Sequence, residues 1–287
     1  MKQIKYWWLA IRPITLTISV VPVVVGIVLA WHHAERFDTL VGAATLLAAM
    51  LIQIGTNLYN DAVDFEKGAD GNDRLGPARA AAQGWLTPAR LKKGAHLAFG
   101  LAFLFGIYLV TVGGWPIVLL GLLSLAAGYA YTGGPRPIAY SAIGELFVFL
   151  FFGLAAVTGS YYLQAGVLDG SALAVAVAIG LLAAAVLLVN NYRDLAGDEQ
   201  AGKLTLVHYI GRPHARRLYA ALVLLPFLLP LFLGHWSFLV WLAMPLALML
   251  IRDFVTLPPE RGFNTLLART ALLQLLFGGL VTLGLLI

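Results

Sequence analysis

The 287-residue sequence contains no cysteine and few charges, since only 11% of its residues are Asp, Glu, Lys or Arg. The lack of cysteine excludes thiolate metal sites, cysteine nucleophiles and a disulfide framework. Soluble domains carry about 25% charged and roughly 45–50% apolar residues. With 60% hydrophobic residues and a mean hydropathy of +0.85, the chain is therefore neither a soluble globular domain nor a disordered one. Its net charge of +5 does not indicate nucleic-acid binding, because the meaning of these charges depends on where they lie.

Long apolar stretches occupy most of the sequence. A transmembrane helix needs about 20 mostly apolar residues, and nine stretches approach that length. They lie at about 14–34, 40–59, 94–112, 116–131, 142–164, 171–190, 215–234, 236–251 and 265–287. The first is too long for the apolar region of a signal peptide, so we interpret it as a retained helix. The sequence thus predicts an all-α membrane protein, a single domain over 1–287 with nine transmembrane helices.

The Lys and Arg residues are divided unequally between the two sides that nine spans define. Eighteen of the nineteen precede the first span or lie in every second connection, and only Arg36 lies on the other side. The positive-inside rule then places the N-terminus in the cytoplasm and the C-terminus outside. We expect a multi-pass protein of the bacterial cell (inner) membrane.

Two of the predicted cytoplasmic connections are long and polar, at about 60–93 and 191–214, whereas the outer connections are very short. Long ordered loops are usually functional. We expect these two loops to cap an active-site cavity on the cytoplasmic side of the bundle.

The two loops begin with similar acidic motifs, at 57–70 and 191–203, offset by 134 residues. The motifs follow spans two and six, which indicates an internal duplication of four helices plus four plus one. The aligned pairs are Asn57 with Asn191, Asn60 with Asp194, Asp64 with Asp198, and Gly68 with Gly202.

The spacing of the acidic residues favours a shared cation site. Residues four apart lie on one helix face, so facing halves would bring at least four carboxylate and amide oxygens together. Such oxygens, without His or Cys, suit Mg²⁺, which binds one or two carboxylates and completes its shell with substrate phosphates. The alternative is that the acids are solvated helix ends paired with nearby cations, but two matched copies favour the shared site. The candidate magnesium ligands are Asn60, Asp64, Asp194 and Asp198, and the candidate phosphate-binding cations are Lys67, Arg79, Arg136 and Lys203.

Further motifs accompany the acidic pair: Arg12-Pro13, 77–79 (PAR), 131–137 (YTGGPRP) and 144–149 (GELFVF). Together they resemble the UbiA superfamily of intramembrane aromatic prenyltransferases over most of the chain. Within that superfamily, 190–194, 202–206 and 144–149 are most similar to the 1,4-dihydroxy-2-naphthoate polyprenyltransferases, which make demethylmenaquinone. The sequence departs from the superfamily at Gly68, where a third Asp is common. Asp70 lies two residues further, an offset that the naphthoate subfamily shares. Ile14 and Leu204 stand where basic residues are common.

The resemblance implies a UbiA-type helical bundle that binds two substrates, a donor and an acceptor. The donor is a polyprenyl diphosphate and the acceptor a bicyclic aromatic hydroxy acid, with loss of carbon dioxide and diphosphate. Mg²⁺ between Asn60/Asp64 and Asp194/Asp198 would chelate the diphosphate, and Asp61 or Asp70 would orient or deprotonate the acceptor. The remaining substrate-binding candidates are Arg12, Asn57, Tyr131, Glu145, Asn191 and Arg193. A groove for the apolar tail is expected between helices, and the Phe and Leu residues of spans five and nine are compatible with lining it.

Three of these residues have two interpretations each. Glu145, inside span five, is either a functional intramembrane acid or a structural partner of Arg136 or of a backbone group. Tyr131 either binds a diphosphate oxygen or is an interfacial tyrosine. Arg12 either lines the cavity entrance or anchors the first helix among lipid headgroups.

Two other functions fit the sequence. An ion-coupled transporter would also have repeats and membrane-depth carboxylates, although here the acids gather at the cytoplasmic helix ends beside basic loops. A sister prenyltransferase would differ only in its acceptor, such as 4-hydroxybenzoate or homogentisate. Beyond substrates and membrane lipid, neither nucleic acid nor an obligate protein partner is expected.

Overall fold

The computed structural model describes residues 2–35, 37–70, 75–260 and 262–287, and the regular structure in these residues is helical throughout. Arg36, Arg74 and Arg261, three of the charges used to orient the chain, lie outside the described residues. In chain order the elements are α1 (Lys2–Ile11), α2 (Pro13–Ala34), α3 (Thr39–Glu66), α4 (Pro88–Gly113), α5 (Trp115–Ala130), the 3₁₀ turn η1 (Ile138–Tyr140), α6 (Gly144–Val148), the π-helical segment η2 (Phe149–Ala155), α7 (Ala156–Ala165), α8 (Gly170–Gln200), α9 (Leu206–Leu224), the 3₁₀ segments η3 (Leu225–Leu231) and η4 (His235–Ala243), α10 (Met244–Thr256) and α11 (Phe263–Leu286).

The predicted all-α membrane fold is confirmed. Over the described part of the chain, eight helical segments are long and apolar enough to cross a membrane, and α5 is a shorter apolar helix beside them. These nine segments correspond one to one with the nine predicted spans, because α6, η2 and α7 form one continuous span and η4 continues into α10.

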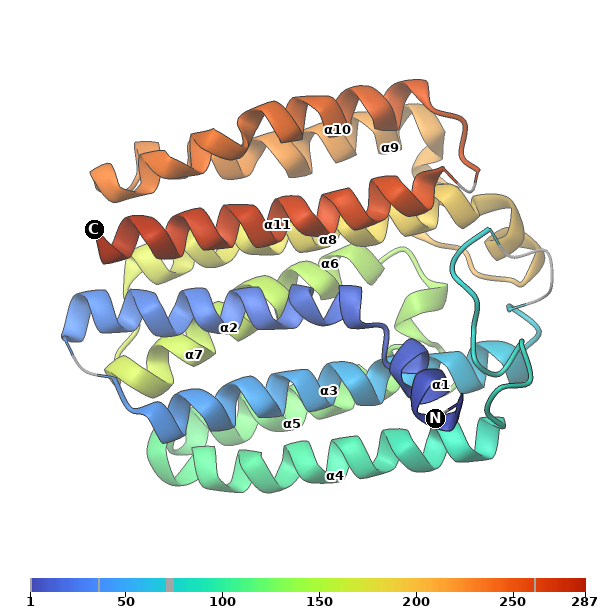
Figure 1. Ribbon diagram of the computed structural model, residues 1–287, viewed down its shortest axis with the longest axis horizontal. Helices are drawn as coiled ribbons and strands as arrows, with labels where there is room; N and C mark the ends of the chain where they lie inside the picture. Colours follow the sequence, from blue (N-terminus) through green and yellow to red (C-terminus); the bar gives the residue numbers. More distant parts are fainter. Residues whose placement is uncertain (1, 36, 71–74, 261) are drawn as a thin grey trace.

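The spans run side by side along the long axis of the molecule (Figure 1). The N-terminal helix α1 and the segment between α3 and α4 lie at one end of the bundle, and the C-terminus lies at the other. Helices α2 and α7 pack together, as do α2 and α11, so the two halves meet along these contacts. The acidic ends of α3 and α8 are both at the end that carries α1 (Figure 1).

Small residues allow α8 to pack closely against the span that starts at α6. A Cβ atom at Gly153 would lie 2.5 Å from the Cα of Gly180 in α8, so neither position has room for a side chain. Close approach at small residues is how transmembrane helices associate, since lipid removes the hydrophobic driving force between them. Gly153 lies within the π-helical segment η2, a geometry that is frequent at functional sites.

The helices extend further than their apolar stretches. Helix α3 continues to Glu66 and α8 to Gln200, so both acidic motifs are helical and not in loops. The expected loop at 191–214 is therefore reduced to 201–205, and the expected loop at 60–93 to 67–87. Polar side chains do not interrupt the backbone hydrogen bonds of a helix when they find partners inside the protein. Helix α1 is an additional short element that packs on α3, with Ile4 and Trp8 exposed.

Candidate active site

Helices α3 and α8 end in the same local structure. Gly68 and Gly202 both have φ of 72°, the left-handed conformation that ends many helices and that glycine adopts without strain. The Ala69 N–H donates to the Asp64 carbonyl at 2.8 Å, and the Lys203 N–H donates to the Asp198 carbonyl at 2.7 Å. The 134-residue offset therefore relates equivalent backbone hydrogen bonds as well as equivalent side chains.

The Asp64 carboxylate connects the two halves of the molecule. Its Oδ2 accepts from Lys203 Nζ at 2.9 Å, across 139 residues of sequence, and from Asn60 Nδ2 at 2.9 Å. Its Oδ1 accepts from the Tyr140 hydroxyl at 2.9 Å. The C-terminal end of a helix carries partial negative charge, so a buried carboxylate there requires cations nearby. Lys203 provides one of them.

Asp194 is held by a buried arginine. The Arg193 guanidinium donates to both Asp194 oxygens, at 2.7 and 2.6 Å. It also donates to Asn190 Oδ1 at 2.8 Å and to Asn264 Oδ1 at 2.7 Å. Because the Arg193 side chain is fully buried, it positions Asp194 and does not itself line the cavity described next.

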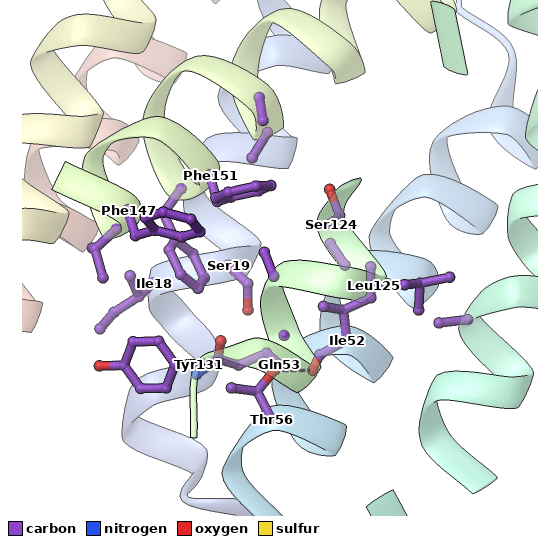
Figure 2. Close-up of a pocket in the computed structure, with 18 of the residues that line it drawn as sticks. Ile18, Ser19, Ile52, Gln53, Thr56, Ser124, Leu125, Tyr131, Phe147 and Phe151 are labelled. Atoms are coloured by element: carbon purple, nitrogen blue, oxygen red, sulfur yellow. Dashed lines mark hydrogen bonds between the residues drawn. The ribbon is translucent and has the colours of Figure 1, made fainter. Parts of the chain in front are cut away.

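A cavity of about 570 Å³ lies between the two halves and receives both acidic motifs. Its polar end is lined by Arg12, Asn57, Asn60, Asp64, Arg79, Tyr131, Asn190, Asn191, Asp194, Asp198 and Lys203. Its long remainder is lined mainly by apolar side chains of α2 to α5 and of the span from α6 to α7. Figure 2 shows Ile18, Tyr131 and Phe147 on one side of this space and Ile52, Thr56 and Leu125 on the other. The expected contribution of span nine to the tail groove is small, since Leu267 is its lining residue in the described chain.

Positive side chains gather around the polar end. Arg12 donates to Asn60 Oδ1 at 2.8 Å, and Arg79 lies 3.4 Å from a carboxylate oxygen of the buried Asp70. The ammonium groups of Lys67 and Lys203 lie 4.6 and 4.8 Å from the ring centre of Tyr140. Arg136 is exposed and is not among the residues that line the cavity.

Arg12 adopts a strained backbone conformation. It has φ of 59° and ψ of 69° and precedes Pro13, although residues before proline favour extended conformations. Such outliers cost about 1–3 kcal/mol and persist where the surrounding structure imposes them. Burial lowers the pKa of Arg12, while the carboxylates of Asp61 and Asp64 oppose that change. Of the two interpretations of Arg12, the structure favours a residue that lines the cavity.

Tyr140 stays protonated beside Asp64. Burial, followed by the charge of Asp64, raises the pKa of Tyr140. Its hydroxyl group is therefore a hydrogen-bond donor at neutral pH, and it uses its proton to bind Asp64.

The Asp61 carboxylate binds backbone N–H groups. Its two carboxylate oxygens accept the backbone N–H groups of Ala80 and Ala81, at 2.9 and 3.1 Å, and its side chain does not line the cavity. It thereby caps the first turn of the segment that carries Arg79. Asp70, the other candidate base, is buried against Arg79 and also lies outside the lining.

The structural interpretation of Glu145 named Arg136 or a backbone group as its partner, and the structure adds a side-chain partner, Asn191. Glu145 Oε1 accepts from Asn191 Nδ2 at 2.9 Å, so its partner is the first residue of the second acidic motif. The aligned residue Asn57 instead donates to the Ile11 carbonyl at 2.8 Å and to Thr15 Oγ1 at 3.0 Å.

Three residues of this network were not expected from the sequence. Tyr140 and Thr132 bind Asp64 and Asn60, and Asn264 connects Arg193 with the carbonyl of Leu75 at 2.9 Å. Thr132 lies within the segment 131–137 and Tyr140 three residues after it, and this was the only sequence signal for either residue. Asn264 carried no signal, because its partners are distant in the sequence.

The oxygen-rich end suits a magnesium ion that is shared with a phosphate. Among the described residues, no three His, Cys, Asp or Glu side chains are grouped closely enough to form an all-protein metal site. Mg²⁺ does not need such a group, since it usually takes one or two carboxylates and leaves the remaining positions to water and substrate phosphates. Asp64, Asp194, Asp198 and the amide of Asn60 line one cavity and match that chemistry.

Comparisons with known proteins agree on one family. The model of the UbiA prenyltransferase family matches residues 19–260. The 1,4-dihydroxy-2-naphthoate octaprenyltransferase of Escherichia coli (strain K12) is 38% identical, over 97% of this chain and 94% of the relative. The enzyme of that name from Bacillus subtilis (strain 168) is 34% identical, over 98% of this chain and 92% of the relative.

A solved structure shares the fold. The UbiA homolog from Archaeoglobus fulgidus bound to DMAPP and Mg2+ superposes with a TM-score of 0.65, covering 98% of this chain and 99% of that one. At 15% sequence identity, this similarity concerns the helical arrangement alone.

Proposed function

The chain belongs to the UbiA prenyltransferase family, and we propose that it transfers a polyprenyl group from polyprenyl diphosphate to 1,4-dihydroxy-2-naphthoate. Carbon dioxide and diphosphate are the other products, and the reaction builds the demethylmenaquinone skeleton. The observation that carries the proposal is the single cavity that receives both acidic motifs at one end and is apolar along the rest. Its two-part lining matches a molecule with a diphosphate head and an isoprenoid tail.

The diphosphate head fits the polar end. Arg12, Arg79 and Lys203 line it, and their side chains are held by Asn60, Asp70 and Asp64 respectively. When the allylic C–O bond breaks, the leaving diphosphate gains negative charge, which fixed cations stabilise most where water is excluded. Lys67 and Arg136 lie outside the lining, so we assign them to diphosphate entry and not to the bond-breaking step.

We assign magnesium to the oxygen ligands Asp64, Asp194, Asp198 and Asn60. Bound there, Mg²⁺ would supply the positive charge that these carboxylates attract and that a diphosphate requires. Arg193 supports this role by holding Asp194 in one orientation through both of its oxygens.

The apolar part of the cavity protects the reaction. Breaking the allylic bond produces a carbocation that water would quench, and side chains such as Ile18, Phe147 and Phe151 surround the space next to the polar end (Figure 2). The electron-rich ring of the acceptor attacks the cation there, and the ring carboxylate leaves as carbon dioxide. We place the polar end of the cavity on the cytoplasmic side of the bacterial cell membrane, in accordance with the distribution of Lys and Arg.

An acceptor panel tests the function. Purified protein in lipid nanodiscs is given a polyprenyl diphosphate and 1,4-dihydroxy-2-naphthoate, 4-hydroxybenzoate or homogentisate, with and without Mg²⁺. We expect covalent product with the naphthoate only, and only with Mg²⁺. Asp64→Ala and Asp198→Ala should abolish product, whereas Asp253→Asn, which alters a partly exposed ion pair with Arg269, should retain activity. Preference for a single-ring acceptor would identify a sister enzyme, and the absence of any covalent product would favour a transporter.

A further inference from the structure

Asn191 and Glu145 form a buried polar pair beside the cavity. Asn191 Nδ2 donates to Glu145 Oε1 at 2.9 Å, and the two residues are 7% and 5% exposed. Asn191 lines the cavity, whereas Glu145 lies behind it in α6 and is not among the lining residues. An acid inside a membrane is costly and is usually retained for a function. The contact suggests that the function of Glu145 is exerted through Asn191.

The pair fixes which end of the amide faces the cavity. A side-chain amide has an NH₂ donor end and an oxygen acceptor end. Because the NH₂ end is bound to Glu145, the oxygen is left for the cavity, and within the described part of the chain no partner binds it. The aligned residue Asn57 differs, since its oxygen already accepts from Gln53 Nε2 at 3.3 Å. The duplication thus offers an open amide oxygen in the second half only.

The chemistry of that oxygen selects its ligand. An amide oxygen only accepts hydrogen bonds, and so does an ionised diphosphate, so the two repel each other. The positive side chains that suit a diphosphate (Arg12, Arg79 and Lys203) are held at the opposite motif, around Asn60, Asp64 and Asp70. A phenolic hydroxyl group, in contrast, has the proton that Asn191 Oδ1 can accept.

The cavity that Asn191 lines also offers an aromatic surface. Phe147 lies two residues after Glu145, lines the cavity and stacks on Phe151 with ring centres 5.4 Å apart. Figure 2 shows Phe147, Ile18 and Tyr131 on the same side of the cavity. Aromatic rings favour such stacked or edge-on neighbours. A flat ring placed here would lie between the polar end and the apolar part of the cavity.

We propose that Asn191 accepts a hydrogen bond from a ring hydroxyl of the aromatic acceptor, and that Glu145 is the positioning residue that holds the Asn191 amide in the required orientation. This inference rests on the proposed prenyl transfer and extends it to the acceptor subsite. It places the acceptor hydroxyl at the start of the second motif, while the donor head stays at the magnesium ligands that both motifs contribute.

Steady-state kinetics with each substrate varied in turn test the subsite. Asn191→Leu and Glu145→Leu should raise the KM for the aromatic acceptor about tenfold, the effect of losing one hydrogen bond. The KM for polyprenyl diphosphate and the Mg²⁺ concentration for half-maximal rate should change less than twofold. Glu145→Gln retains an oxygen that can accept from Asn191 and should stay within threefold of wild type. Thr158→Val, in the same span but outside the cavity lining and bonded only to its own helix, is the control.

Inhibition by hydroxynaphthoates identifies the hydroxyl group. Two hydroxynaphthoates are compared as inhibitors, one that keeps the ring hydroxyl bound by Asn191 and one that lacks it. In the wild type, the compound that lacks this hydroxyl should inhibit about tenfold more weakly. In Asn191→Leu, the two compounds should inhibit equally. Three outcomes would each overturn the proposal. The first is an equal increase in the KM values for acceptor and donor in Asn191→Leu or Glu145→Leu, and the second is a changed Mg²⁺ requirement in these variants. The third is a Glu145→Gln variant as impaired as Glu145→Leu. If the wild type prenylates a different aromatic hydroxy acid, the same comparison applies to that acceptor. A wild type with no prenyl transfer contradicts the proposed function itself, whereas an active wild type with unaffected variants contradicts only this inference.

Discussion

At the residue scale, the carboxylates of the two motifs divide into those that face the cavity and those that hold its walls. Asp64, Asp194 and Asp198 line the cavity. Asp61 lies next to Asn60 in sequence, yet successive residues of a helix point in different directions. Its oxygens are therefore directed to the N–H groups of Ala80 and Ala81 instead. A buried carboxylate that binds two backbone donors is well suited to fixing a loop and poorly placed to accept a proton from a substrate.

Asp61→Asn distinguishes these roles. The amide keeps one accepting oxygen for the Ala80–Ala81 turn, so we expect turnover within about tenfold of wild type together with a lower melting temperature. Loss of a general base would instead reduce turnover by about 10²–10⁴-fold. Turnover at saturating concentrations of both substrates and thermal unfolding in detergent give the answer. A collapse of turnover with an unchanged melting temperature would assign Asp61 to the chemistry.

Asn264 offers a second test at this scale. Its oxygen accepts from Arg193 and its NH₂ group donates to the Leu75 carbonyl, so each end of the amide can be examined separately. Asn264→Asp keeps the oxygen for Arg193, and Asn264→Leu removes both contacts. Leaving a buried donor unpaired costs about 1–3 kcal/mol. We therefore expect the Leu variant to be clearly less stable and less active than the Asp variant. Equal losses in the two variants would show that the tie to Leu75 is the contact that matters.

At the element scale, the ends of α3 and α8 determine where the motif side chains lie. The apolar stretches predicted every span, because composition alone decides which segments can enter a membrane. The helical continuation to Glu66 and Gln200 was not predicted, because the hydropathy pattern stops where polar residues begin while the helix does not. The pairing of Asp64 with Lys203 was anticipated only as a convergence of the two motifs. The partners Tyr140 and Asn264 depend on contacts between distant segments that no local pattern encodes.

Two glycines, Gly197 inside α8 and Gly202 just beyond its end, form a matched pair for testing the helix end. Gly202 has φ of 72°, and a side chain in that conformation costs about 1–2 kcal/mol. Gly197 lies inside the helix, where a Cβ atom meets nothing within 4 Å. Gly202→Ala should lower the melting temperature and the activity, because Lys203 follows it and binds Asp64. Gly197→Ala should raise the melting temperature, since alanine is favoured over glycine in a helix by about 0.8–1.0 kcal/mol. The reverse order of melting temperatures would contradict the described helix end.

At the scale of the whole molecule, the two halves enclose one cavity whose apolar part reaches α4 and α5. Phe103 and Ile107 of α4 and Leu122 of α5 line the cavity and are also about half exposed. A long isoprenoid chain can therefore extend from the polar end toward the lipid along these helices. The bundle thus accommodates both a charged head and a tail that exceeds the enclosed volume.

Gly106 tests this path. It lines the cavity in α4, and a Cβ atom there would meet nothing within 4 Å, so a large side chain would occupy cavity space without a clash. Gly106→Phe should lower kcat/KM for a long polyprenyl diphosphate by at least about tenfold, because the blocked tail must leave the apolar surface that stabilises each buried CH₂ by about 0.8 kcal/mol. Its effect on dimethylallyl diphosphate, which is too short to reach α4, should be below threefold. Gly100→Phe is the control, since Gly100 has open space on the same helix but does not line the cavity. Equal losses with long and short donors would exclude the space beside Gly106 as the tail path.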